Sequence, residues 1–296
     1  MGESTNMIKN FIISASICLS FANCSTISLP KPQNVSRVNI TKFARESIIF
    51  IESVHTLVEK TENGNVELQT RASNGSGSII YHGKDFSLTL TAAHVCTIIN
   101  NRQKITMFPE YRHLVDSTEV TTANILTDIH GNEYKATPVI WNKTHDTCIL
   151  MSSKIPLHAL NIANDERLEI GKKYYNLAFP RAIWAKNFVP SFEGVYIGDF
   201  EEGIFHASSY SMPAAPGSSG SPILNDRGQV VGVLHSAMYN FEYLALAATP
   251  AQTSEIFHLV QEFLKQLQAM DNACDIKKDI IDINCKQNDS NLLESR

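Results

Sequence analysis

The stretch AAPGSSGSP, at residues 214–222, decides how the rest of the chain is interpreted. It is followed by a turn, NDRG at residues 225–228, and by the strand-like run QVVGVL at residues 229–234. Gly, Ser and Pro are common turn residues, so an ordinary loop leading into a hairpin is one interpretation. The other is chemical, because Ser219 lies between Gly217 and Gly220. A serine hydroxyl becomes an effective nucleophile when a base takes its proton.

The glycine before this serine favours the chemical interpretation. Glycine reaches backbone conformations that a residue with a Cβ atom resists. In such a conformation the N–H groups of Gly217 and Ser219 would point at one spot and form an oxyanion hole for acyl transfer. A nucleophilic Ser219 also requires a histidine base, and a carboxylate that orients it, from elsewhere in the chain.

Two other motifs supply those groups. The run TAAHVC at residues 91–96 contains His94, and THDTCIL at residues 144–150 contains Asp146. Together with GSSGSP at residues 217–222, they resemble the three motifs of the trypsin-like (chymotrypsin-fold) serine proteases, in the family's order. The resemblance covers about residues 45–268, the protease domain only. Within the family the chain looks more similar to the bacterial HtrA-like and glutamyl-endopeptidase-like branch, where runs such as GSGSII at residues 75–80 are typical.

The resemblance implies a serine endopeptidase that uses no metal ion or organic cofactor and acts on protein or peptide substrates. His94 would be the general base, Asp146 would orient it, and Ser219 would form an acyl-enzyme that water hydrolyses. Asp128 and Asp165 lack the small and apolar continuation that follows Asp146. Two alternatives stay open: an inactive protease fold that serves in binding or adhesion, and an esterase for small acyl groups.

The family builds its substrate pocket from the residues before the nucleophile and from the strand after it. Here the walls contain no Asp or Glu, and the pocket residues are Pro213, Ala214, Ala215, His235 and Ser236. A Lys or Arg side chain would be buried there without a partner, at a large cost in free energy. The walls therefore predict cleavage after small or medium apolar residues. A His235 ring that turned inward would instead favour an acidic residue.

Composition and the N-terminus bear on location. A net charge of −5, with Lys and Arg scattered, argues against nucleic-acid binding. Lys9 and the short apolar run at residues 11–22 predict an export signal within residues 1–24, cleaved after Ala22. The run FANC at residues 21–24 also resembles a lipoprotein box, and only lipidation of Cys24 would attach the chain to a membrane. We expect an exported protein, secreted or periplasmic.

Cysteine pairing follows from that location. We expect Cys274 and Cys285 to form a disulfide in an oxidising compartment. Cys96 and Cys148 either pair or remain small buried thiols, and both possibilities stay open. None of the cysteine spacings matches a zinc site.

Short β-rich runs predict an all-β fold of two six-stranded antiparallel barrels, at about residues 45–160 and 165–250. Expected strands include Val66–Ala72, Gly77–Tyr81 and Lys104–Phe108. A capping box at Thr249–Gln252 begins a C-terminal helix at residues 250–268, with apolar residues every three or four positions. Residues 25–44 are expected to form a linker or arm, and residues 269–296 a polar tail.

Overall fold

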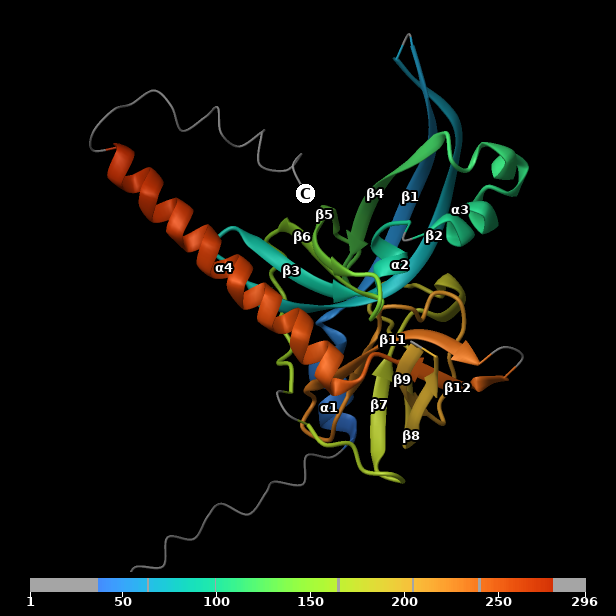
Figure 1. Cartoon of the computed structure of the whole chain (residues 1–296). Coiled ribbons are helices and arrows are strands. Elements are labelled where there is room, and N and C mark those ends of the chain that lie inside the picture. The colour runs from blue at the N-terminus through green and yellow to red at the C-terminus, as the bar shows by residue number, and fades with distance from the viewer. Residues whose placement is uncertain are drawn as a thin grey trace, which may run out of the picture. The chain divides into compact units, whose positions relative to one another are not determined.

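The computed structural model describes residues 37–278, apart from residues 63, 99, 164, 165, 204, 239 and 240. The predicted export signal, most of the predicted arm, and residues 279–296 with Cys285 lie outside the described residues, so the expected Cys274–Cys285 bond does too. Two closed antiparallel β-barrels follow one another along the chain (Figure 1). The predicted all-β fold, with two six-stranded barrels and a C-terminal helix, is confirmed.

The first barrel closes in the strand order β1-β2-β3-β6-β5-β4. Its strands are β1 (Ile48–Thr61), β2 (Gly64–His82), β3 (Phe86–Thr91), β4 (Thr118–Thr127), β5 (Glu133–Asn142) and β6 (Thr147–Ser153). Buried residues alternate with more exposed ones along β1, and Ile49 and Ile51 face the core. The expected strands at Val66–Ala72 and Gly77–Tyr81 are one strand, β2, because residues 73–76 between them also pair with β1.

The second barrel closes in the order β10-β11-β12-β9-β8-β7. Its strands are β7 (Lys173–Leu177), β8 (Ser191–Glu202), β9 (Phe205–Tyr210), β10 (Pro222–Leu224), β11 (Val230–Met238) and β12 (Phe241–Ala247). The fully buried rings of Tyr174 and Tyr210 pack edge to face in its core, with centroids 5.5 Å apart. Residues 211–221 connect β9 to β10, and β10 pairs with β11 as the predicted hairpin requires.

Short helices occupy the connections: α2 (Ala93–Cys96), α3 (Asn101–Met107), and the 3₁₀ helices η1 (Pro109–Leu114) and η2 (Pro180–Ala182). The strand expected at Lys104–Phe108 is wrong, because most of these residues lie in α3. Asn100 caps this helix by accepting a hydrogen bond from the N–H of Gln103. The Lys104 ammonium group donates to the carbonyl oxygen of Val115 at 2.6 Å. The Asn100 cap and the hydrogen bond of the buried Lys104 ammonium group therefore outweigh the β-propensity of residues 104–108.

Two helices differ from the predicted boundaries. Helix α1 (Arg37–Arg45) replaces the end of the predicted arm, because Ile40 and Ala44, one turn apart, are buried in the core. Helix α4 (Pro250–Lys278) begins at the predicted capping box but continues past residue 268, because no Gly or Pro follows to end it. Within the part of the chain described, no helix combines the length and the apolar character needed to cross a membrane.

Candidate active site

His94 and Asp146 lie side by side at one end of the first barrel. Strand β3 ends just before α2, which carries His94, and β6 begins just after Asp146. The two strands pair, with Thr91 opposite Cys148, so the two residues meet. Nδ1 of His94 is 2.6 Å from Oδ2 of Asp146, and the N–H of His94 donates to Oδ1 at 2.9 Å. One carboxylate thus holds both the ring and the backbone of the histidine.

The electrostatics of this pair favour an ionised carboxylate. Burial by itself raises the pKa of Asp146, but hydrogen bonds from the ring and the backbone of His94 outweigh it, and the pKa is lowered. The backbone of Asp146 has a φ of 49°, in the left-handed region that Asp tolerates better than most residues. The carboxylate can therefore fix the orientation of the imidazole and stabilise its protonated form.

A disulfide lies behind the same pair. Cys96 follows His94 by two positions, Cys148 follows Asp146 by two, and their sulfur atoms are bonded. Both cysteines are fully buried. The structure therefore resolves the choice that the sequence left open, in favour of the pairing. The bond links α2 covalently to the start of β6.

Ser219 lies in the loop between β9 and β10, in the second barrel. Gly217 has a φ of 94°, which a residue with a Cβ atom resists. The N–H of Ser218 donates to the carbonyl oxygen of Ala215 at 2.8 Å, which closes a tight turn. Within the described part of the chain, the N–H groups of Gly217 and Ser219 have no hydrogen-bond acceptor. They are therefore available to an oxygen atom of a substrate.

The hydroxyl of Ser219 is hydrogen-bonded to a backbone carbonyl group. It donates to the carbonyl oxygen of His235 at 3.4 Å, and among the described residues no hydrogen bond joins it to His94. Contacts between a nucleophile and its base are often long in unliganded enzymes and shorten when substrate binds. Because the hydroxyl has a single proton, transfer to His94 requires that this proton be donated to the imidazole ring instead of to the carbonyl oxygen of His235.

The predicted pocket residues differ in exposure. Ala214 and His235 are buried, whereas Pro213, Ala215 and Ser236 are partly exposed. The ring Nδ1 of His235 is 2.9 Å from Oγ of Ser236. Burial lowers the pKa of His235 to about 4, so this ring carries no charge at neutral pH. The uncharged ring therefore provides no cation at the position where the sequence predicts a pocket wall.

Asp128, one of the two alternatives to Asp146, makes hydrogen bonds within a turn. It is fully buried and accepts hydrogen bonds from the N–H groups of His130 at 2.8 Å and Asn132 at 2.9 Å. Nδ2 of Asn132 donates to it as well, at 2.9 Å. These contacts close the turn between β4 and β5. The other alternative, Asp165, lies outside the described residues.

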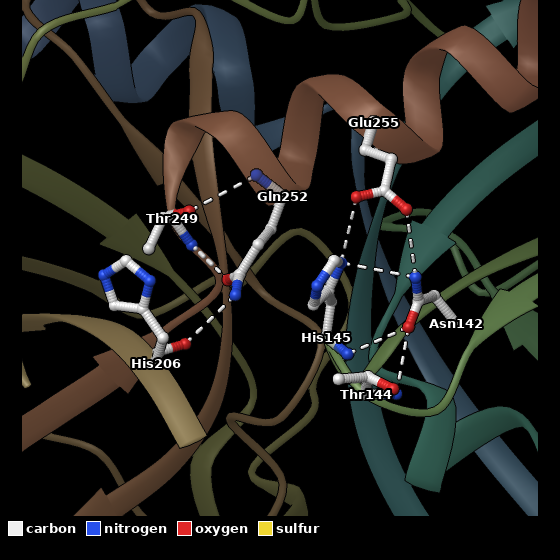
Figure 2. A network of polar contacts seen from close by, with 7 residues as sticks. All are labelled: Asn142, Thr144, His145, His206, Thr249, Gln252 and Glu255. Carbon is white, nitrogen blue, oxygen red and sulfur yellow. Dashed lines mark hydrogen bonds and ion pairs between the residues drawn. The ribbon is translucent and has the colours of Figure 1, made fainter. Parts of the chain in front are cut away.

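Residues 142–145, which come just before Asp146, are hydrogen-bonded to helix α4 (Figure 2). Oδ1 of Asn142 accepts from the N–H groups of Thr144 and His145, at 2.9 and 3.0 Å. Nδ2 of Asn142 donates to Oε1 of Glu255 at 3.3 Å, and Nδ1 of His145 is 3.3 Å from Oε2 of Glu255. The sequence motifs indicate neither Asn142 nor Glu255, because the two lie 113 residues apart and no local pattern joins them.

Comparisons with known proteins agree on the fold. A family model described as a trypsin-like peptidase domain matches residues 75–233. An HtrA-type protease, AlgW, solved with a decapeptide, has a TM-score of 0.57 at 13% identity, over 77% of this chain and 67% of that one. An inactive form of Rv3671c from M. tuberculosis has a TM-score of 0.52 at 14% identity, over 78% of this chain and 94% of that one.

A serine endoprotease from Yersinia pestis has a TM-score of 0.51 at 16% identity, over 75% of this chain and 65% of that one. No curated protein matches the chain. At these identities the solved structures show a shared fold, whereas the family match is made by the sequence itself and includes His94, Asp146 and Ser219. Because that match covers more than half of the chain, the protein belongs to the trypsin-like peptidase family.

Proposed function

We propose that the protein is a serine endopeptidase, with Ser219 as nucleophile, His94 as general base and Asp146 as the residue that orients the base. The observation that carries the proposal is the double contact of one carboxylate with the ring and backbone of His94. The N–H groups of Gly217 and Ser219, which have no acceptor among the described residues, add the second part that acyl transfer needs. The HtrA-type relative was solved with a decapeptide, and we propose a peptide or protein substrate here as well.

The contact between His94 and Asp146 supports the proposed chemistry. Nδ1 of His94 faces Asp146, which leaves Nε2 to take the proton of Ser219 as its oxygen attacks the carbonyl carbon. The negative charge that develops on the carbonyl oxygen is stabilised by the N–H groups of Gly217 and Ser219. His94 then gives its proton to the leaving amine, and an acyl-enzyme remains on Ser219. Water, activated by the same histidine, releases the acid.

Labelling with a fluorophosphonate tests this assignment. The wild-type chain should be labelled on Ser219, and Ser219→Ala should lose both labelling and peptide hydrolysis while its unfolding temperature stays near that of the wild type. Ser218→Ala, which keeps the nucleophile, should still be labelled. A wild-type chain that the probe does not label would favour the inactive, binding alternative. Labelling with ester turnover and no peptide turnover would favour the esterase.

We propose that the enzyme cleaves after small or medium apolar residues such as Ala, Val or Leu. The pocket residues Pro213, Ala214 and Ala215 carry no charge, and the uncharged ring of His235 supports an apolar over an acidic preference. Burial of one methylene contributes only about 0.8 kcal/mol, so the preference should be broad. Cleavage sites in a peptide library measure it. A dominant preference for Arg or Lys would contradict the proposal, and one for Glu would assign His235 a charged role.

A further inference from the structure

The loop that carries Ser219 is hydrogen-bonded to β2 of the first barrel, through Ser76. The N–H of Ser76 donates to the carbonyl oxygen of Ser219 at 2.8 Å. The hydroxyl of Ser76 donates to the carbonyl oxygen of Gly217, also at 2.8 Å, and accepts from the N–H of Phe179 at 2.9 Å. Ser76 is fully buried, so these contacts are shielded from water.

We propose that Ser76 is a positioning residue that keeps the oxyanion hole formed. It holds the Gly217–Ser218 and Ser219–Gly220 peptide groups, which flank the peptide group that carries the N–H of Ser219. The proposal rests on the proposed function, because it assigns to the N–H groups of Gly217 and Ser219 their role in catalysis. Ser76 itself does not touch the substrate in this proposal. It acts through the backbone of residues 217–219.

The loop needs an external support because of its glycine. Gly217 lacks a Cβ atom, so its carbonyl group turns more freely than that of another residue. A turn of this group would redirect the neighbouring N–H groups, which must point at a single oxygen atom. The hydroxyl of Ser76 fixes the Gly217 carbonyl. The N–H of Arg181, 2.5 Å from the carbonyl oxygen of Pro216, fixes the peptide group that carries the Gly217 N–H.

The Ser76 hydroxyl connects the two contacts that hold the loop, its own bond to Gly217 and the bond between Arg181 and Pro216. Its acceptor bond with Phe179 anchors the start of the segment that contains Arg181. The loop and β2 also lie too close for a side chain between them. A Cβ atom on Gly220 would come within 2.1 Å of the carbonyl oxygen of Ser76, and one on Gly75 within 3.1 Å of the carbonyl oxygen of Ser219. Loss of the Ser76 hydroxyl would remove the hydrogen-bond partner of two buried groups, the N–H of Phe179 and the carbonyl oxygen of Gly217.

The test compares Ser76→Ala with Ser78→Ala. Ser78 lies on the same strand, is almost fully buried, and its hydroxyl has no hydrogen-bond partner within the described residues. Each variant removes one buried hydroxyl from β2, and only one of them removes a support of the nucleophile loop. The substrates are an acylated peptide methyl ester that ends in alanine and its thionoester, whose sulfur accepts hydrogen bonds poorly.

Removal of one oxyanion donor typically lowers kcat by about 10²–10³-fold, so the indirect loss in Ser76→Ala should be about 10–100-fold, with little change in KM. The ratio of ester to thionoester turnover should fall in Ser76→Ala and stay at the wild-type value in Ser78→Ala. This ratio does not depend on how much of the variant is folded. A merely structural role would lower both rates equally and leave the ratio unchanged.

The outcomes separate this proposal from the one it rests on. A wild-type chain that forms no acyl-enzyme overturns both. A wild-type chain that turns over the ester, with a Ser76→Ala variant whose ratio equals that of the wild type, overturns the role of Ser76 alone. A ratio that falls equally in Ser78→Ala would also overturn it, because the effect would then belong to any buried hydroxyl of β2.

Discussion

Two buried histidines make the stability of the fold depend on pH. His55 is fully buried in β1, with its ring nitrogens 2.9 Å from Oγ1 of Thr122 and Oγ of Ser73. Burial lowers its pKa from 6.5 to about 4, as it does for His235. Between those values the unfolded chain binds protons that the folded chain does not. The contribution of these two neutral rings to stability is therefore full above about pH 6.5 and is lost as the pH falls toward about 4.

We predict that His55→Gln removes part of this sensitivity to acid. Gln keeps groups that hydrogen-bond to Thr122 and Ser73 but takes up no proton. The free energy of unfolding in urea, measured between about pH 4 and 7, should fall less steeply than in the wild type, by up to about 1.4 kcal/mol per pH unit. An unchanged slope would mean that His55 is protonated in the folded protein.

Among the elements, helix α4 has a connection to each barrel. It contacts β11 in the second barrel and β5 and β6 in the first. Nε2 of Gln252 donates to the carbonyl oxygen of His206 at 3.1 Å, and Glu255 binds Asn142 and His145 one turn later (Figure 2). The second set of contacts fastens the loop that ends in Asp146. The helix therefore supports the candidate site without contributing a residue to it.

We predict that Glu255→Ala slows turnover without changing KM. Loss of the carboxylate frees Asn142 and His145, so Asp146 holds the imidazole less firmly. A misplacement of 1 Å at a catalytic group costs roughly a hundredfold in rate, and kcat should fall by less than that, because Oδ1 of Asn142 still holds the loop. Steady-state kinetics measure the effect.

Glu262→Ala is the matched control, because within the described residues Glu262 pairs only with Lys265, on its own helix. It should retain the wild-type kcat. Equal values of kcat for Glu255→Ala and Glu262→Ala would show that the contact with the Asp146 loop has no effect on the base.

For the whole molecule, the candidate site combines residues from both barrels. His94 and Asp146 come from the first barrel and Ser219 from the second. The Cys96–Cys148 bond stabilises the first barrel where the histidine and the aspartate meet. Disulfides persist in oxidising compartments, so the bond is consistent with the proposed export of the chain.

We predict that the disulfide contributes about 2–4 kcal/mol to the free energy of unfolding. Cys96→Ala combined with Cys148→Ala should lose that amount and become insensitive to reductant, whereas the wild type should lose it only when reduced.

Chain recovered from its natural compartment should be oxidised and begin just after Ala22 or at a lipidated Cys24. A reduced chain that still begins at Met1 would contradict the proposed export.

Local sequence was sufficient where the signal is local. The motifs around His94, Asp146 and Ser219 are short, and each can be recognised without its neighbours in space. Alternating burial marks β1 without reference to its partners. Local propensity failed at Lys104, which was expected in a strand, because a helix cap and a carbonyl oxygen from residue 115 decide its conformation.

The sequence by itself thus determined the fold class, the three motifs and their order, whereas the tertiary structure decided what holds them in place. The bond of Cys96 with Cys148 was only one of two possibilities until the strands were paired. Ser76 meets Gly217 across 141 residues, and Asn142 meets Glu255 across 113. Such contacts follow from the closure of the barrels and the packing of α4 against them. No pattern within a short segment encodes them, because each hydrogen bond depends on the register of strands far apart in the chain.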